Sequence, residues 1–193
     1  PPGSVMNERK LSEEMGISRT PIREGLQMLA RDGWLQMETY KGAVVREFDP
    51  HYMWELIRIR YALELSAVED AVRNMTDEGL RRLRQIQENQ REDLLNYNVD
   101  EFIRHDREFH SCIYEMSLNR ELMKLASNYY DVFRFLGTQA VMGTEERRLT
   151  TIEEHQAILD AAEKHDPQAA VQAMKMHMEQ TEKNIRRHIK IAP

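Results

Sequence analysis

The chain has 193 residues, of which 41% are hydrophobic and 31% are charged, as in a folded water-soluble protein. It has no apolar run of the roughly 18 residues that span a bilayer, so we expect no membrane partner. It opens without a signal-peptide pattern, and its single cysteine excludes an intrachain disulfide framework, so we expect a cytoplasmic location. Eight glycines and six prolines favour a mainly helical fold.

The net charge of −6 argues against a uniformly basic nucleic-acid-binding protein. Residues 1–48 carry seven Lys/Arg and seven Asp/Glu, so the whole excess of negative charge lies downstream. Any attraction of this first segment for phosphate therefore depends on where its cations lie and not on its total charge.

A short helix, a tight turn and a second helix are expected near the start of the chain. Residues 7–15 predict the first helix, which ends at Gly16. Ser18 has the side chain of an N-cap, and Pro21 falls in the first turn of the second helix, where its missing N–H costs nothing. This order predicts a helix-turn-helix, whose second helix enters the major groove of DNA.

The exposed beginning of this second helix is rich in groups that bind nucleic acid. Arg19, Thr20 and Arg23 crowd that end, and a guanidinium fork matches both guanine O6/N7 and phosphate oxygens. Ile22, Leu26 and Leu29 recur at helical spacing and predict a buried stripe. The alternative is an ordinary amphipathic surface helix with solvated arginines.

A change from helical to strand periodicity follows residue 33. Residues 34–38 and 43–46 predict two strands, joined by a turn at residues 39–42. This hairpin would form a wing, and its tip at Lys41 and Gly42 can approach a groove or phosphates.

Residues 1–48 resemble the winged helix-turn-helix of the GntR family of bacterial transcription regulators, through PPGS, NERKLSEEMGISRTPIREGLQMLARDGWL and YKGAVV. In that family a further helix precedes the Pro-Gly turn, so we expect that this chain begins inside the domain. Gly25 stands where the family more often has alanine, at a cost of roughly 1 kcal/mol in helix stability. The resemblance implies double-stranded operator DNA as the partner. It implies these DNA-contacting residues: Arg9, Ser18, Arg19, Thr20, Arg23, Lys41 and Gly42.

Residues 49–193 predict an all-α domain that follows a short linker at residues 48–50. We expect N-caps at Thr76, Thr144 and Asp166. Together these helices would form an antiparallel six-helix bundle. The expected helices span residues 51–74, 76–95, 99–116, 120–142, 144–164 and 166–189.

Polar side chains interrupt the apolar stripes of these helices. Asp106 and His110 lie one turn apart on the third helix, while His155 and His177 lie on the stripes of the fifth and sixth. Buried groups of this kind are normally paired or bind a metal. One carboxylate and three imidazoles would suit Zn²⁺, Ni²⁺, Mn²⁺ or Fe²⁺. The alternative is a set of core histidines that only form hydrogen bonds.

Residues 51–190 resemble the ligand-sensing helical (FCD) domain of the FadR subfamily of GntR regulators, in its shorter six-helix, VanR-like form. Its members commonly hold a divalent metal through Asp-x-x-x-His and two later histidines. DREFH, EEHQAIL and MKMH supply this set here, at Asp106, His110, His155 and His177. The resemblance also implies a small organic acid as the effector, with its carboxylate at a free position of the ion.

Two arginines are candidates for binding the effector. Arg60 lies in RYALE, which resembles the Arg-x-x-Leu-Glu element of the family, and its guanidinium can bind a carboxylate as a bidentate fork. The alternative is an intrahelical pair with Glu64 or a surface position. Arg134 in the fourth helix is a weaker candidate.

Other polar side chains have simpler expected roles. His105 is the next candidate ligand because it neighbours Asp106. Cys112 is expected in the core, and the charged run at residues 145–148 is expected to be a solvated first helical turn.

We therefore expect a cytoplasmic transcription regulator, in the form of a repressor, and not an enzyme. It would act as a homodimer on a near-palindromic operator, since paired recognition helices read paired half-sites. One alternative is a metal-dependent hydrolase of helical-bundle fold, in which the ion would activate water. Another is a helical binding module with purely structural histidines.

Overall fold

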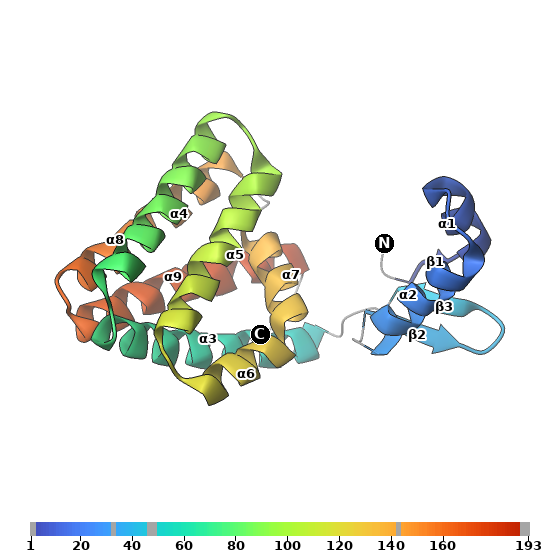
Figure 1. The fold of residues 1–193 in the computed structure, drawn as a ribbon, viewed down its shortest axis with the longest axis horizontal. Helices are drawn as coiled ribbons and strands as arrows, with labels where there is room; N and C mark the ends of the chain where they lie inside the picture. Colours follow the sequence, from blue (N-terminus) through green and yellow to red (C-terminus); the bar gives the residue numbers. More distant parts are fainter. Residues whose placement is uncertain (1–2, 32–33, 46–49, 142–143, 190–193) are drawn as a thin grey trace. The chain divides into compact units, whose positions relative to one another are not determined.

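A computed structural model describes residues 3–31, 34–45, 50–141 and 144–189 (Figure 1). The chain divides into two compact units, Pro1–Asp49 and Pro50–Pro193. The expected linker and the expected end of the recognition helix at residues 32–33 fall largely outside the described residues.

The first unit is a small helix-turn-helix with a three-stranded antiparallel sheet in the strand order β1-β3-β2. This confirms the expected arrangement of two helices and a hairpin wing. The sequence did not predict β1, which has only two residues and pairs with β3, about 40 positions later. The elements are β1 (Val5–Met6), α1 (Glu8–Met15), α2 (Arg19–Arg31), β2 (Leu35–Glu38) and β3 (Gly42–Val45).

Local chemistry explains the boundaries of these elements. The Asn7 side chain accepts hydrogen bonds from the first N–H groups of α1, and Gly16 ends the helix with a left-handed φ of 68°. Gly42 has a φ of 82° at the tip of the wing, which favours a residue without a Cβ.

The core of the first unit is small. It contains Ile22 and Leu26 of α2 packed against Leu35 and Ala43 of the sheet. Leu29 was expected to join this stripe but is 41% exposed. The expectation was wrong at this position, because the next residue, Ala30, packs against the core from this turn of α2 instead.

The second unit is all helical, which confirms the expected helical bundle. The expected N-caps at Thr76, Thr144 and Asp166 each accept a hydrogen bond from a backbone N–H three residues later. No helix within the described ranges is both long enough and apolar enough to cross a membrane. The helices are α3 (Pro50–Arg73), α4 (Asp77–Leu95), α5 (Val99–Met116), α6 (Arg120–Asn128), α7 (Tyr130–Val141), α8 (Glu145–Glu163) and α9 (Pro167–Ile189).

The single helix expected over residues 120–142 is instead two helices, α6 and α7, so that prediction was wrong. The break falls at Tyr129, with φ −111° and ψ 10°. Its N–H bonds to Ala126 and Ser127 carbonyls, which tightens the chain at the end of α6. The described bundle therefore has seven helices and not six.

The helices of the bundle enclose one large apolar core. Figure 1 shows α4 beside α5 and α8 beside α9, and α3 packs against both α5 and α9. Phe109, Ile113 and Met174 are among the fully buried side chains between them. Cys112 lies in the same core, as expected, and burial raises the pKa of its thiol to about 11.

Candidate metal centre

Three histidines from three helices meet inside the second unit. His110 of α5, His155 of α8 and His177 of α9 each offer a ligand nitrogen, and these atoms all lie within 4.8 Å of one another. All three side chains are buried. The Phe109 ring stacks on the His155 ring, with centroids 4.0 Å apart, and so fixes its plane.

The outer nitrogen of each imidazole is held by an acceptor on another helix. Bonds of this kind fix the orientation of a metal-binding histidine and direct its other nitrogen at the ion. The three Nδ1 contacts are to Glu64 Oε2, 2.9 Å from His110, to Gln90 Oε1, 2.9 Å from His155, and to Glu154 Oε2, 2.8 Å from His177.

The inner atoms of the cluster lack partners within the part of the chain that the structure describes. Nε2 of His110, Nε2 of His155 and Oδ1 of Asp106 are buried and form no hydrogen bond. The Asp106 oxygen lies 3.8 Å from Nε2 of His155. Unpaired buried polar atoms are rare in proteins, and a bound ion would account for these three. The donor set therefore fits a divalent metal, with Asp106 beside the three histidines.

Burial also favours the protonation states that such an ion requires. Burial lowers the pKa of His155 and of His177, so both rings stay neutral and able to bind a metal. Burial raises the pKa of Glu64, but the contacts with His110 and Arg60 outweigh it, and the pKa falls to about 2. Glu64 thus remains an anion that can accept the His110 N–H.

A buried ion pair extends the network beyond His177. Glu154 accepts hydrogen bonds from both terminal nitrogens of Arg147, at 3.0 Å, as well as from His177. The Arg147 side chain is only 8% exposed. The expectation that it lies in a solvated turn was wrong, because α9 covers it and its guanidinium reaches Thr181 there.

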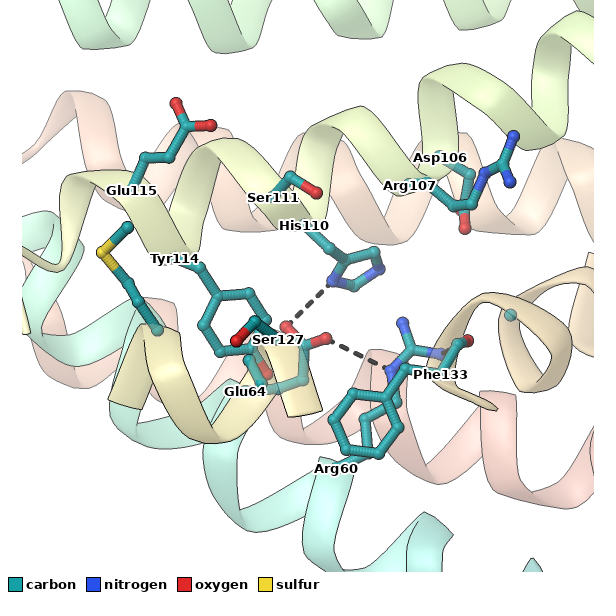
Figure 2. A pocket seen from close by; sticks show the side chains of 13 residues that line it. Arg60, Glu64, Asp106, Arg107, His110, Ser111, Tyr114, Glu115, Ser127 and Phe133 are labelled. Carbon is teal, nitrogen blue, oxygen red and sulfur yellow. Dashed lines mark hydrogen bonds and ion pairs between the residues drawn. The ribbon is translucent and has the colours of Figure 1, made fainter. Parts of the chain in front are cut away.

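A cavity of about 190 Å³ adjoins the histidine cluster. Arg60, Glu64, Asp106 and His110 line its polar end. Figure 2 shows His110 and Arg60 both pointing at the Glu64 carboxylate. The rest of its wall comes from these residues: Arg107, Ser111, Tyr114, Glu115, Met123, Ala126, Ser127, Phe133 and Gly137.

Arg60 is buried in the wall of this cavity and is not a surface arginine. Its Nε lies 3.2 Å from Glu64, the intrahelical pair considered as an alternative, and its Nη1 donates to the Phe133 carbonyl at 3.2 Å. The pair and the cavity position occur together, so the guanidinium still faces the space beside the histidines. Arg134 belongs to α7, but its side chain lies outside the described part.

The candidate DNA-contacting residues lie on the surface of the first unit, separate from this centre. The side chains of Arg19 and Arg23 are 61% and 57% exposed, and both pair with Glu8, which sequence reasoning did not single out. Lys41 lies 2.7 Å from Glu38 at the wing. Arg9, which pairs with Glu13, is also exposed, as are Ser18, Thr20 and Gly42.

The sequence analysis did not identify the residues that support the histidines. Gln90, Glu154 and Arg147 were missed, although Glu154 directly precedes His155. His105, the next candidate ligand, pairs with Asp93 at 2.6 Å and does not belong to the cluster of three.

Comparison with known proteins agrees with this architecture. Residues 55–180 match the FCD domain, and residues 1–45 match the gntR family of bacterial regulatory proteins. The chain is 30% identical over 177 residues to the uncharacterized HTH-type transcriptional regulator YdhC of Bacillus subtilis (strain 168), which covers 91% of this chain and 79% of that protein. It is 24% identical over 188 residues to the HTH-type transcriptional repressor RspR of Escherichia coli (strain K12), covering 96% and 81%.

Among solved structures, E. coli McbR/YncC matches with a TM-score of 0.80 and 25% identity, over 96% of this chain and 88% of that one. These relatives are transcriptional regulators, so the hydrolase alternative is set aside. The chain belongs to the GntR family of bacterial transcriptional regulators, as a member with an FCD domain, an organisation consistent with the FadR subfamily.

Proposed function

We propose that this regulator represses transcription as a homodimer on a near-palindromic operator in the cytoplasm. A small carboxylate effector, bound beside a divalent metal ion in the second unit, would change its affinity for the operator. The observation that carries the effector part is the cluster of anchored histidines, in which Nε2 of His110 and of His155 is unpaired, beside a cavity that His110 and Arg60 line. The repressor role is supported by the similarity to the repressor RspR.

His110, His155, His177 and Asp106 would hold the ion, which would be Zn²⁺, Ni²⁺, Mn²⁺ or Fe²⁺. When bound, it would supply a positive centre that attracts a carboxylate. Arg60 would add a second positive charge at the same end of the cavity, and Arg134 is a weaker candidate for the same role. The effector can change operator affinity only if it binds one arrangement of the DNA-binding units more tightly than another.

The operator would be read by the exposed end of α2 and by the wing. Arg19 and Arg23 would bind guanine edges or phosphates, with Ser18, Thr20 and Arg9 beside them. The wing would contribute contacts from its tip, at Lys41 and Gly42.

The metal part is tested by elemental analysis of the purified full chain after loading with Zn²⁺. Wild-type protein should hold one ion per chain, and the double variant H110A/H155A should hold none, because two of the inner nitrogens are lost. H51A is the matched control, since His51 is an exposed histidine of α3. Equal metal content in all three proteins would refute the site.

The DNA part is tested with an operator selected from random duplexes. R19A and R23A should each weaken operator binding, by a factor that corresponds to about 1–3 kcal/mol for a base contact. R31A removes the same charge from the other end of α2 and should bind with nearly unchanged affinity. Unchanged gel shifts for R19A and R23A would assign recognition to another element.

A further inference from the structure

We infer that Tyr114 donates a hydrogen bond to the carboxylate group of the effector. This inference rests on the proposed function, because it concerns the cavity beside the candidate metal ion. It adds a specificity-determining residue to the site.

The charges that line the cavity favour an anion once a divalent ion is bound. Arg60 and Arg107 balance Glu64 and Asp106 in the wall, while Glu115 pairs with Arg82. A divalent ion would leave this wall with an excess of positive charge, which favours a carboxylate.

The Tyr114 hydroxyl is an unused hydrogen-bond donor in the wall of the same cavity. Its oxygen is buried and has no hydrogen-bond partner among the described residues. Burial raises the pKa of Tyr114 far above its usual range, and the Glu64 charge raises it further, so the hydroxyl keeps its proton. Tyr114 lines this cavity together with Glu64 and Arg60.

A buried hydroxyl without a partner is unfavourable, and a ligand oxygen would satisfy it. A carboxylate has two oxygens, so one can face the ion while the other accepts from Tyr114. Hydrogen bonds to a charged acceptor are stronger than those between neutral groups, which makes this contact a selective one.

The hydroxyl of Ser127, in the same wall, differs from that of Tyr114. It already donates to the Lys124 carbonyl at 2.8 Å, so it needs no ligand oxygen. Met123 and Ala126 supply apolar surface to the wall, where a hydrocarbon part of the effector can pack.

The test is isothermal titration of the full chain, loaded with Zn²⁺, with hexanoate and with adipate. These acids have the same number of carbon atoms, and adipate differs by its second carboxylate. For the acid that the wild-type chain binds more tightly, Y114F should lose roughly tenfold in affinity while its metal content stays equal to wild type.

S127A is the matched control, because it removes a hydroxyl from the same cavity that is already satisfied within the protein. Its affinity for that acid should equal that of the wild-type chain. A Y114F variant with wild-type affinity would overturn the role of Tyr114. Zinc-loaded protein that binds neither acid would instead refute the effector part of the proposed function.

Discussion

Arginine–glutamate pairs occur in both units of the chain, but in opposite surroundings. In the first unit Glu8 pairs with Arg19 and Arg23, whose side chains are more than half exposed. In the second unit Arg147 and Glu154 pair with only 8% and 12% of their side chains exposed. The same guanidinium–carboxylate pair is therefore exposed to water in the first unit and buried among helices in the second.

The exposed pairs are held weakly, because water and salt compete with them. Arg23 can therefore leave Glu8 for a phosphate or a guanine at little cost. The buried pair has no such alternative, since α9 covers it. Its structural role is to hold Glu154 in position against His177, and Glu154 in turn orients the His177 ring.

The largest difference between the two kinds of pair should appear when the buried one is broken. R147M removes one partner and leaves Glu154 as a buried charge without its bidentate contact. The second unit should lose about 3–5 kcal/mol of unfolding free energy, measured by urea denaturation. R104M removes an exposed guanidinium from α5 and should leave the urea midpoint unchanged within error. Similar midpoints for the two variants would mean that burial makes no difference.

Metal loading should stabilise one unit and not the other. With free Zn²⁺ at one hundred times its dissociation constant, the second unit should gain about 2.7 kcal/mol, because only its folded state presents the histidines together. Thermal unfolding with and without a chelator measures this gain. H110A/H155A should show no gain, and a gain retained in that variant would place the ion elsewhere.

A smaller effect on stability is expected from replacing the glycine within α2 by alanine. A Cβ added at Gly25 would meet nothing within 4 Å, so G25A should stabilise α2 by up to about 1 kcal/mol. Hydrogen exchange of the α2 amides reports this gain within the intact chain, and operator affinity should not change. G42A is the contrasting control and should not stabilise the first unit, because the φ of 82° at Gly42 disfavours alanine. Faster exchange of the α2 amides in G25A than in wild type would contradict the prediction.

The smallest effect on stability is expected at the exposed pair itself. E8Q should leave the unfolding midpoint unchanged, although Arg23 holds the pKa of Glu8 below its usual value. It should nevertheless raise affinity for nonspecific DNA about threefold at low salt, because it removes a negative charge beside Arg19 and Arg23, the two arginines proposed to contact DNA. Fluorescence anisotropy at two salt concentrations measures this change. E14Q removes a charge that pairs with Lys10 instead, and an equal rise there would make the effect one of net charge alone.

Features set by neighbours in the sequence could be predicted. The caps at Thr76 and Thr144 and the two helices of the DNA-binding unit follow from contacts within a few residues. The three histidines were found because each interrupts an apolar stripe at helical spacing, which marks a buried position. Their meeting at one point is a geometric consequence of packing three amphipathic helices on one core.

Features set by distant neighbours could not be predicted. Arg147 sits in a charged first turn that is typical of a solvated face, and only the packing of α9 makes it buried. The strand β1 exists because β3 pairs with it, and two residues carry no periodicity of their own. The break at Tyr129 has neither glycine nor proline to mark it.

The continuity of helix α3 bears on how ligand binding would be transmitted along the chain. It is continuous over 24 residues from Pro50, and it carries Arg60 and Glu64 in the wall of the cavity. Its first residue directly follows the DNA-binding unit. In the proposed function, an effector bound at this wall would therefore act directly on a continuous helix whose first residue follows the DNA-binding unit along the chain, with no series of rearranged side chains needed inside the bundle.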